Sequence, residues 1–349
     1  MRGRRRSNAS LLPDQVHYVD QDSGEIVNKP ISRGKFLQYF ANRMPCLIGM
    51  EACGGSHHWA RQLTGMGHQV RLMPAEFVKA FNIRNKNDAA DARAIWLAVQ
   101  QPGKAIAVKT EMQQAMLALH RSREQLVKFR TMQINCLRGL LTEYGQVMGK
   151  GRSALDKAMP DVLARLADRL PAVLIDTLCE QWNGLTKLDK QIAAIERRLR
   201  EWKKEDGPVK AISEIPGVGL LTATAAVAMI GDARTFKSGR EFAAWAGLVP
   251  KQTGSGGKVN LHGISKRGDT YLRTLLIHGA RSVLQHAKAP GPWVEQMRKR
   301  RPPNVLIVAL ANKMARTIWA VLAHGRSYQK GYVSVAPAST NGSVDHTYR

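Results

Sequence analysis

The stretch Pro45–Pro74, "PCLIGMEACGGSHHWARQLTGMGHQVRLMP", decides the fold class of the N-terminal part of the chain. Its opening run, "PCLIGMEACGG", is continuously apolar and ends in small residues, which predicts a buried strand leading into a turn. Ser56 then begins a helical segment that ends near Gly67. A second strand, "QVRLMP", stops at Pro74. Strand, helix and strand in this order predict a parallel sheet with crossover helices, so we expect an α/β domain.

Two shorter segments precede this stretch. The runs "DQVHYVD" and "EIVNK" alternate apolar and polar residues on either side of "DSG", which predicts a β-hairpin. In "SRGKFLQYFANR", the spacing of Phe36, Leu37 and Phe40 predicts a helix. The N-terminal part is therefore expected to contain a hairpin and a helix, followed by the strand–helix–strand unit.

In the middle of the chain the apolar residues change their period. They recur at about heptad spacing from Met112 to Leu140, and at steps of three and four from Leu178 to Trp202. Charged residues fill the gaps, as in "KLDKQIAAIERRLREWKKE". This pattern predicts two long helices that form an antiparallel coiled-coil arm, with a plain helical bundle as the alternative.

The last part of the chain has a mainly helical pattern. In "ISEIPGVGLLTATAAVAMIGD", Gly217 and Gly219 permit a tight turn, as in a helix-hairpin-helix that grips a phosphate backbone; an ordinary interhelical turn is the alternative. "SGREFAAWAGLVP" predicts another helix. "KQTGSGGK" is rich in Gly and Ser, so a loop is expected before the basic helix "KRGDTYLRTLLIHGARSVL". The Ser-, Gly- and Pro-containing tail after Tyr328 is expected to be disordered.

The chain is strongly basic along its whole length. Its 349 residues include 53 Lys and Arg against 27 Asp and Glu, which gives a formal charge of +26. Such an excess indicates a polyanionic partner, most simply nucleic acid, although a merely basic protein such as a ribosomal one has the same composition. The length exceeds that of one ordinary core, so two or three domains are expected.

Cysteine and histidine patterns do not indicate a zinc site. The four cysteines are scattered and form no CxxC pair: Cys46, Cys53, Cys136 and Cys179. They fit the reduced thiols of a cytoplasmic protein. The spacing of His57, His58 and His68 favours surface or DNA-facing histidines over metal ligands. No apolar run approaches the roughly 20 residues of a membrane span, so we expect a cytoplasmic protein without a membrane partner.

Three acids occupy positions that suit a metal site. Glu51 ends a predicted buried strand, where sites form in open parallel sheets. Asp88 and Asp91 lie one turn apart at the start of a predicted helix, where they could simply cap the helix and complement its dipole. Three converging carboxylates could instead hold one or two Mg²⁺ ions on a phosphodiester. Arg84 and Lys86 would then contact phosphates.

Several long motifs resemble one known family. "GMEACGGSHHWARQL", "RNKNDAADARAI" and the run from "IPGVGLLTATAAVAMIGDARTF" to "GISKRGDTYLRTLLIHGAR" are similar to the one-hundred-and-ten family of bacterial insertion-sequence transposases. The resemblance extends from about residue 15 to 325. It implies a RuvC-like, RNase H-fold domain with a D-E-D-D acid set over residues 1–105. A coiled-coil arm over 106–205, a mainly helical transposase domain over 206–328 and a tail over 329–349 would follow.

The resemblance also implies roles for individual residues. Glu51 matches the family's second acid, and Asp88 and Asp91 match the third and fourth, with Mg²⁺ as the cofactor. Ser255, in "TGSGGK", matches a serine that attacks DNA and forms a 5′-phosphoserine link. Four basic side chains near that serine could steady the phosphate charge: Lys258, Lys266, Arg267 and Arg273.

Partners follow from the same resemblance. The family's enzymes act on DNA at the element ends and at the target, guided by a structured bridge RNA that pairs separately with target and donor. The resemblance also implies a homo-oligomer, a tetramer, associated with the bacterial nucleoid in the cytoplasm. Two rival functions remain open: a RuvC-type metal-dependent nuclease without serine chemistry, and an inactive nucleic-acid-binding remnant.

The chain departs from the family pattern at its first acid. The family's first aspartate lies on an opening strand, whereas the register here places Asn8, within "RRRSNAS", at that position. Residues 1–14 lack a strand pattern, so the first strand of the domain is doubtful. An asparagine carbonyl can ligate a metal but brings no charge, which would weaken Mg²⁺ binding. Two explanations stay open, a misassigned start codon and a truncated, inactive copy.

Overall fold

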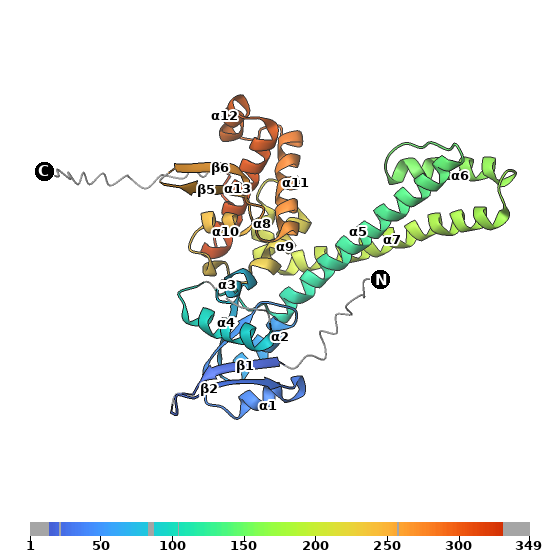
Figure 1. Cartoon of the computed structure of the whole chain (residues 1–349). Coiled ribbons are helices and arrows are strands. Elements are labelled where there is room, and N and C mark those ends of the chain that lie inside the picture. Colours follow the sequence, from blue (N-terminus) through green and yellow to red (C-terminus); the bar gives the residue numbers. More distant parts are fainter. Residues whose placement is uncertain (1–13, 21, 83–86, 104, 257, 331–349) are drawn as a thin grey trace.

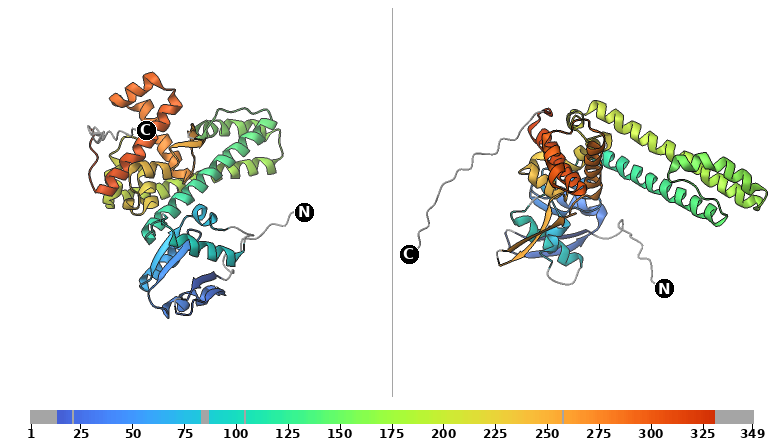
Figure 2. Two further views of the ribbon diagram at one scale, coloured as in Figure 1. Left: turned by 60° about the vertical axis from the view of Figure 1, so that its left-hand side comes forward. Right: turned by 90° about the horizontal axis from the view of Figure 1, so that it is seen from above.

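The computed structural model describes residues 14–20, 22–82, 87–103, 105–256 and 258–330. The predictions made for Asn8, Arg84, Lys86 and the tail beyond residue 330 fall outside these ranges. Figure 1 shows an α/β part at the N-terminal end, a long helical arm and a helical C-terminal part. The two further views in Figure 2 show the arm projecting away from both.

The strands of the N-terminal part form two small sheets. β1 (Asp14–Val19) and β2 (Ile26–Ile31) pair antiparallel, as the hairpin prediction required. β3 (Leu47–Glu51) and β4 (Gln69–Met73) pair in parallel, in a register that places Glu51 opposite Met73. The crossover helix α2 (Ser56–Gly65) joins these two strands. The predicted strand–helix–strand unit is therefore confirmed.

Further helices cover these sheets. They are η1 (Arg33–Lys35), α1 (Phe36–Ala41), α3 (Ala75–Lys79) and α4 (Asp88–Gln100). α1 and α2 pack on one face, where Phe36, Phe40 and Leu63 are buried with Val16 and Ile48 of the strands. A separate cluster forms between β4, α3 and α4. The α/β part thus contains two small hydrophobic clusters rather than one.

The arm consists of two long helices that lie side by side, α5 (Glu111–Glu143) and α7 (Ala172–Glu205) (Figures 1 and 2). The two long helices were predicted from the heptad-like spacing. Two ion pairs of 2.7 Å join them, from Arg123 to Glu196 and from Arg130 to Asp189. A third helix, α6 (Arg152–Ala167), packs on their distal ends and was not predicted.

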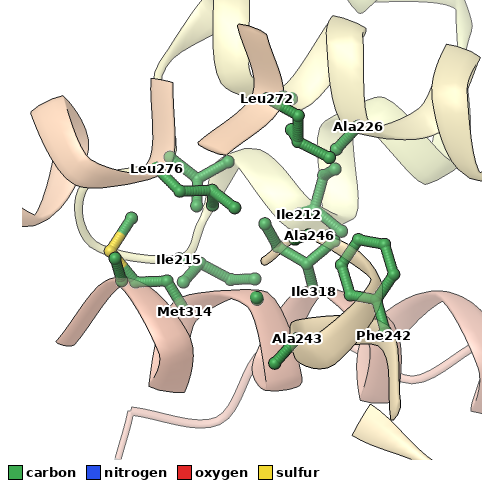
Figure 3. Close-up of a cluster of buried hydrophobic side chains, with 14 of the residues drawn as sticks. Ile212, Ile215, Ala226, Phe242, Ala243, Ala246, Leu272, Leu276, Met314 and Ile318 are labelled. Carbon is green, nitrogen blue, oxygen red and sulfur yellow. The ribbon is translucent and has the colours of Figure 1, made fainter. Parts of the chain in front are cut away.

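The C-terminal part is built around one large hydrophobic core, part of which is shown in Figure 3. Its helices are α8 (Gly207–Ser213), α9 (Leu220–Ile230), η2 (Ala233–Thr235), α10 (Gly239–Trp245), α11 (Thr270–His286), α12 (Pro292–Arg300) and α13 (Pro303–His324). Ile212, Phe242, Leu276 and Met314 come from four of these helices and meet in the core (Figure 3).

Helix α13 is long and apolar enough to cross a membrane by length and composition alone. Its apolar side chains are nevertheless occupied inside the protein, since Leu310, Met314 and Ile318 belong to the C-terminal core. Lys313 also packs over the Trp293 ring, 4.8 Å from its centroid. The helix is thus packed as a core helix of this domain.

The Gly-rich segment before α11 forms a hairpin, so the loop predicted for it is wrong. β5 (Pro250–Ser255) and β6 (Lys258–Ile264) pair antiparallel, with a register irregularity between Pro250 and Gln252. Gly256, at the turn, has a φ of 57°, which glycine adopts without steric cost. The glycines therefore serve the hairpin turn rather than an open loop, and both strands are exposed except at Ile264, the last residue of β6.

Candidate active site

The three acids predicted as metal ligands line one groove. Glu51 is the last residue of β3, and Asp88 and Asp91 lie in the first turn of α4. The groove has a volume of about 820 Å³ and runs between β1 and β3. Asp88 is exposed, whereas Glu51 and Asp91 are half-buried. The fold therefore places on one groove acids that are up to 40 residues apart in the chain.

Helix capping, the alternative explanation for the two aspartates, is performed by another residue. The N-cap of α4 is Asn87, whose Oδ1 accepts a hydrogen bond of 2.7 Å from the amide of Ala90. Asp91 Oδ1 instead accepts a 2.6 Å hydrogen bond from the Asn82 side-chain amide. Both aspartates still complement the helix dipole, but their carboxylates are free of the N-cap role.

The donor set suits a hard divalent cation, because three carboxylates line the groove and such ions prefer oxygen ligands. The three carboxylates are chemically suitable ligands, but they are not close to one another. Among the residues that the structure describes, no three His, Cys, Asp or Glu side chains are grouped closely enough to hold a metal ion. Glu51 belongs to β3, whereas the start of α4 is tied to β2 by a 3.0 Å hydrogen bond from Asn28 Nδ2 to the Ala89 carbonyl.

Ser255 lies on the exposed hairpin and does not line the groove. Its cross-strand partner is Lys258, and the next pair on the same face is Thr253 with Asn260. Thr253 Oγ1 lies 2.6 Å from His262 Nε2, which places that histidine on this face as well. The candidate nucleophile thus has a lysine opposite it on a polar, solvent-facing surface.

Arg273 does not lie where a phosphate contact was predicted, and that prediction is corrected. Its side chain is buried, with 7% exposed. The guanidinium donates to the carbonyls of Ala246 and Arg267, at 3.2 and 2.9 Å, and to Thr270 Oγ1 at 3.0 Å. Arg273 therefore holds the turn before α11 in place, while Lys258, Lys266 and Arg267 are exposed.

The two turn glycines have different surroundings. Gly217 has a φ of 85°, and a Cβ added there would lie 2.8 Å from the carbonyl oxygen of Gly279 on α11. Its backbone is thus packed against a helix, which gives it a structural role, and a nucleic-acid contact there stays a prediction. Gly219 is exposed, caps the start of α9 and has no atom within 4 Å of an added Cβ. A phosphate contact at Gly219 stays a prediction.

Two histidines expected at the surface are instead built into the fold. His68 is 3% exposed, and its Nδ1 accepts a 3.2 Å hydrogen bond from the amide of Cys46. His57 Nδ1 accepts a 3.2 Å hydrogen bond from the amide of Lys109. Burial, followed by the positive charges of Lys109 and Arg61, lowers the pKa of His57 to about 4. Their spacing in the sequence held no signal for these contacts.

A buried polar cluster around His120 joins the arm to the C-terminal part. His120 of α5 is 1% exposed, and its Nδ1 and Nε2 each lie 3.0 Å from a hydroxyl, of Tyr271 and Thr224 respectively. The Thr224 hydroxyl donates to the Leu220 carbonyl, so Nε2 must carry the histidine proton and Nδ1 must accept from Tyr271. Burial lowers the pKa of His120 to about 4, with a smaller contribution from Arg123.

Comparison with known proteins agrees with this organisation. A family model described as "Transposase IS116/IS110/IS902 family" matches residues 209–293, and a second transposase model, for the DEDD domain of IS110-type elements, matches residues 14–146. A probable family 20 transposase of Pseudomonas aeruginosa is 42% identical over 323 residues, covering 91% of this chain and 96% of its own.

Two further relatives are transposases of named elements. The transposase of IS1328 from Yersinia enterocolitica is 37% identical, over 90% of this chain and 95% of its own. The transposase of IS1111A from Coxiella burnetii is 38% identical, over 91% and 88% respectively. The α/β domain with its acidic groove and the helical domain that follows are thus those of a transposase, an enzyme that recombines DNA. The chain belongs to the IS110/IS116/IS902 family of insertion-sequence transposases.

Proposed function

We propose that this transposase cuts and rejoins DNA with two sets of groups, the carboxylates of the groove and the hydroxyl of Ser255. The observation that carries the proposal is the convergence of Glu51, Asp88 and Asp91 on one groove, with the N-cap role taken by Asn87. The match to a DEDD transposase model implies a divalent metal cation. We take that cation to be Mg²⁺, held by these three acids.

The groove residues would position and neutralise the phosphodiester. Bound Mg²⁺ would supply positive charge to the oxygens of the phosphate that reacts. Glu51 and Asp91 are half-buried, so their carboxylates are partly shielded from solvent and are suited to hold a cation at a fixed place. Asn82, which donates to Asp91 Oδ1, would fix the orientation of that carboxylate.

The hairpin would supply the nucleophile. Ser255 Oγ attacks the phosphorus and loses its proton, the bond from phosphorus to the neighbouring O3′ breaks, and that O3′ leaves with a proton as a hydroxyl. The product is a 5′-phosphoserine link, which conserves the energy of the broken bond for rejoining. Lys258, paired across the hairpin from Ser255, would offset the charge on the phosphate.

Nucleic acids are the proposed partners. DNA is implied by the transposase family itself, and the formal charge of +26 suits a polyanion. Exposed Lys258, Lys266 and Arg267 lie on or beside the hairpin, where a backbone phosphate could reach them. We further propose a bridge-type RNA guide, a homo-tetramer and a cytoplasmic, nucleoid-associated location, all of which rest on the family resemblance.

The decisive experiment separates serine chemistry from a metal-dependent nuclease. Ser255→Ala is assayed with end-labelled element DNA and guide RNA, on denaturing gels that reveal protein–DNA links. We expect the covalent species and strand cleavage to disappear together. The matched control is Asn260→Ala, an exposed neighbour on the same face of the hairpin, which should retain both. Unchanged cleavage by Ser255→Ala would instead establish the RuvC-type nuclease.

A second candidate function, an inactive binding remnant, is favoured by one observation. Within the described ranges the acids of the groove do not form a metal-binding group of three. Such a remnant binds DNA or RNA with a steep salt dependence but transfers no strand, even with the correct RNA. Strand transfer by the 349-residue chain would exclude it.

If strand transfer is observed, Asp88→Asn should abolish cleavage while DNA binding persists. The control variant is Asp161→Asn, on the exposed face of α6.

A further inference from the structure

The β5–β6 hairpin is a two-stranded ribbon with solvent on both faces. Its strand residues are exposed except at Ile264, and Figure 1 shows the ribbon projecting from the helices of the C-terminal part. The major groove of DNA is about 12 Å wide and admits a two-stranded ribbon of this kind. The sequence Pro250–Ile264 contains no Asp or Glu, so no carboxylate on the ribbon would repel the phosphates that border the groove.

One face of the ribbon carries hydrogen-bonding side chains beside the candidate nucleophile. Thr253 lies two residues from Ser255 on the same strand, and therefore on the same face. Thr253 Oγ1 lies 2.6 Å from Nε2 of His262, so the histidine belongs to this face as well. The opposite face carries Val259 and Leu261, which are 65% and 64% exposed. Polar groups other than the serine hydroxyl are thus available where the DNA would lie.

Thr253 and His262 hold each other in place. Their contact uses Nε2 of the ring, and no described residue is hydrogen-bonded to Nδ1. The pair therefore presents a methyl group, a hydroxyl group and one unused ring nitrogen on an exposed surface. Such groups distinguish base pairs in the major groove, where base nitrogens, oxygens and the thymine methyl group are displayed. Asn260, opposite Thr253, has no side-chain hydrogen bond to a described residue and is not fixed in this way.

The ribbon is fixed where it leaves the C-terminal core. The amide of Lys266, just after β6, donates to the Gly247 carbonyl at 3.2 Å. Lys266 has a φ of 54°, a left-handed conformation that persists only when surrounding contacts determine it. The guanidinium of Arg273 supplies one such contact, at 2.9 Å from the Arg267 carbonyl. A ribbon that is fixed at its base can hold its side chains at a set position relative to DNA.

We propose that Thr253 and His262 recognise the edge of one base pair in the major groove, beside the phosphate that Ser255 attacks. This inference rests on the proposed function, which places DNA against this face of the ribbon. A strand rises about 3.3 Å per residue and stacked base pairs about 3.4 Å. Since Thr253 is two residues from Ser255, the recognised base pair lies within about two base pairs of the broken bond. The enzyme thus has a sequence preference of its own, apart from any that a guide RNA confers.

The residues of this face have different roles in DNA binding. His262 contacts the base through Nδ1, whereas the Thr253 hydroxyl is a positioning group that sets the orientation of the ring. Lys258, beside Ser255, contacts a phosphate, which is the same in every sequence. Changes at His262 should therefore alter which sequences bind, and changes at Lys258 should weaken binding to all of them.

The test measures binding, so it does not depend on cleavage. The full chain, without RNA, is mixed with a pool of DNA duplexes in which a short central stretch is randomised, and the bound duplexes are sequenced. The wild-type chain should enrich one base pair about 10-fold over its alternatives, the discrimination of one good base contact. His262→Ala and Thr253→Val should reduce this enrichment to less than about twofold. Thr253→Ser keeps the hydroxyl and should retain most of it.

The control variants separate this contact from general effects on the ribbon. Asn260→Ala, on the same face but outside the pair, and Leu261→Ala, on the opposite face, should keep the full enrichment. Lys258→Ala should lower the affinity equally for every sequence.

Three outcomes would overturn the proposal: no enrichment by the wild-type chain, enrichment that survives His262→Ala, or enrichment that is lost in Leu261→Ala instead. The covalent protein–DNA link is assayed separately. Absence of that link with enrichment intact would reject the serine chemistry and leave base recognition standing, so the two proposals fail in different experiments.

Discussion

The α/β part and the helical C-terminal part bury their apolar side chains in different ways. In the described C-terminal part, one cluster includes Ile212, Phe242 and Leu276 and joins nearly every helix. In the α/β part, the buried residues fall into two small clusters, one beside α1 and α2 and one beside α3 and α4. A groove lined by residues of β1 and β3 runs between these strands, which pair only with β2 and β4 among the residues that the structure describes.

The two candidate sites, the acidic groove and the hairpin with Ser255, lie in parts of the molecule that are packed differently. The continuous core fixes the turn from which the exposed hairpin projects, through Arg273 and the backbone at Gly247. The acids line a groove in the part with the smaller clusters, and Glu51 comes from a different element than Asp88 and Asp91. Since stability scales with the apolar area removed from water, the α/β part should be the less stable of the two.

The largest expected effect comes from removing one leucine in each part. Leu276 of α11 and Leu63 of α2 are both fully buried, so Leu→Ala removes the same atoms. We expect a loss of about 4 kcal/mol for Leu276→Ala and about 2 kcal/mol for Leu63→Ala, since the cost depends on how far the site can relax. The smaller cluster beside the open groove can relax more. Region-resolved hydrogen exchange measures both losses, and equal losses would contradict the comparison.

A pair of histidines sharpens the comparison through pH. His120 lies in the joint between the arm and the C-terminal core, with a folded pKa of about 4 against the usual 6.5. Protonation therefore favours the unfolded state, so its stability contribution is intact above pH 6.5 and is lost as pH falls toward 4. By pH 4.5 the loss should reach about 2–3 kcal/mol.

The two histidines can be compared by replacing each of them with glutamine. His120→Gln should remove this pH-dependent loss, measured as the difference in urea unfolding between pH 7 and pH 4.5. Burial, followed by the charge of Arg93, also lowers the pKa of His17. The contribution of His17 to stability should therefore also be lost as pH falls. His17→Gln should produce a smaller change, because His17 lines the groove and is less enclosed. A larger change for His17→Gln than for His120→Gln would contradict the inference that His120 has the more enclosed environment.

The next largest loss of stability is expected from Gly→Ala substitutions at glycines that lie against a neighbouring element. A Cβ on Gly279 of α11 would lie 2.1 Å from the Gly217 carbonyl oxygen, a backbone atom that cannot move without shifting the turn. A Cβ on Gly49 of β3 would lie 2.8 Å from Val99 Cβ of α4, a less severe overlap than the 2.1 Å at Gly279. We expect Gly279→Ala to destabilise by about 2–3 kcal/mol and Gly49→Ala by about 1 kcal/mol. Gly139→Ala on α5, with nothing within 4 Å, should instead stabilise by roughly 0.5–1 kcal/mol.

The smallest effect is expected outside both cores, on the hairpin. Ser255 and Lys258 are exposed and make no hydrogen bond through their side chains to other described residues that would be lost. Ser255→Ala and Lys258→Ala should therefore change the free energy of unfolding by less than about 0.5 kcal/mol. Thermal unfolding checks this, and a larger loss would mean that the hairpin supports the fold. A loss of covalent DNA linkage by Ser255→Ala could then no longer be assigned to chemistry alone.

Much of the fold could be predicted from local patterns. The alternation in residues 14–31, the apolar run before Glu51 and the spacing of Leu178 to Trp202 each gave an element that the structure contains. α6 was missed because Pro160 lies inside it, and proline usually interrupts a helix. β5 and β6 were missed because their glycines suggest a loop, whereas in the structure they allow close pairing and a tight turn.

The candidate site was predictable only in its residue types. Acids after a strand and at a helix start indicated Glu51, Asp88 and Asp91, and the structure places all three on one groove. Nothing in the chain near Arg273 distinguishes it from Lys266 or Arg267, yet only Arg273 is buried among backbone carbonyls. That distinction depends on how α11 packs against the end of α10, which a linear pattern does not contain.

By itself the sequence determined the order of most elements, the basic charge, the acids and serine available for chemistry, and the transposase family. The charge and most elements follow from residue types and their spacing, which act locally along the chain, whereas the family and the candidate serine follow from the resemblance of long motifs. Only the tertiary structure decided which groups meet: that Asn87 rather than Asp88 caps α4, that Arg273 holds a turn, and that Glu51 lines the same groove as Asp88 and Asp91. The physical reason is that burial and hydrogen bonding between distant segments depend on packing in three dimensions, where neighbours are chosen by shape and not by position in the chain.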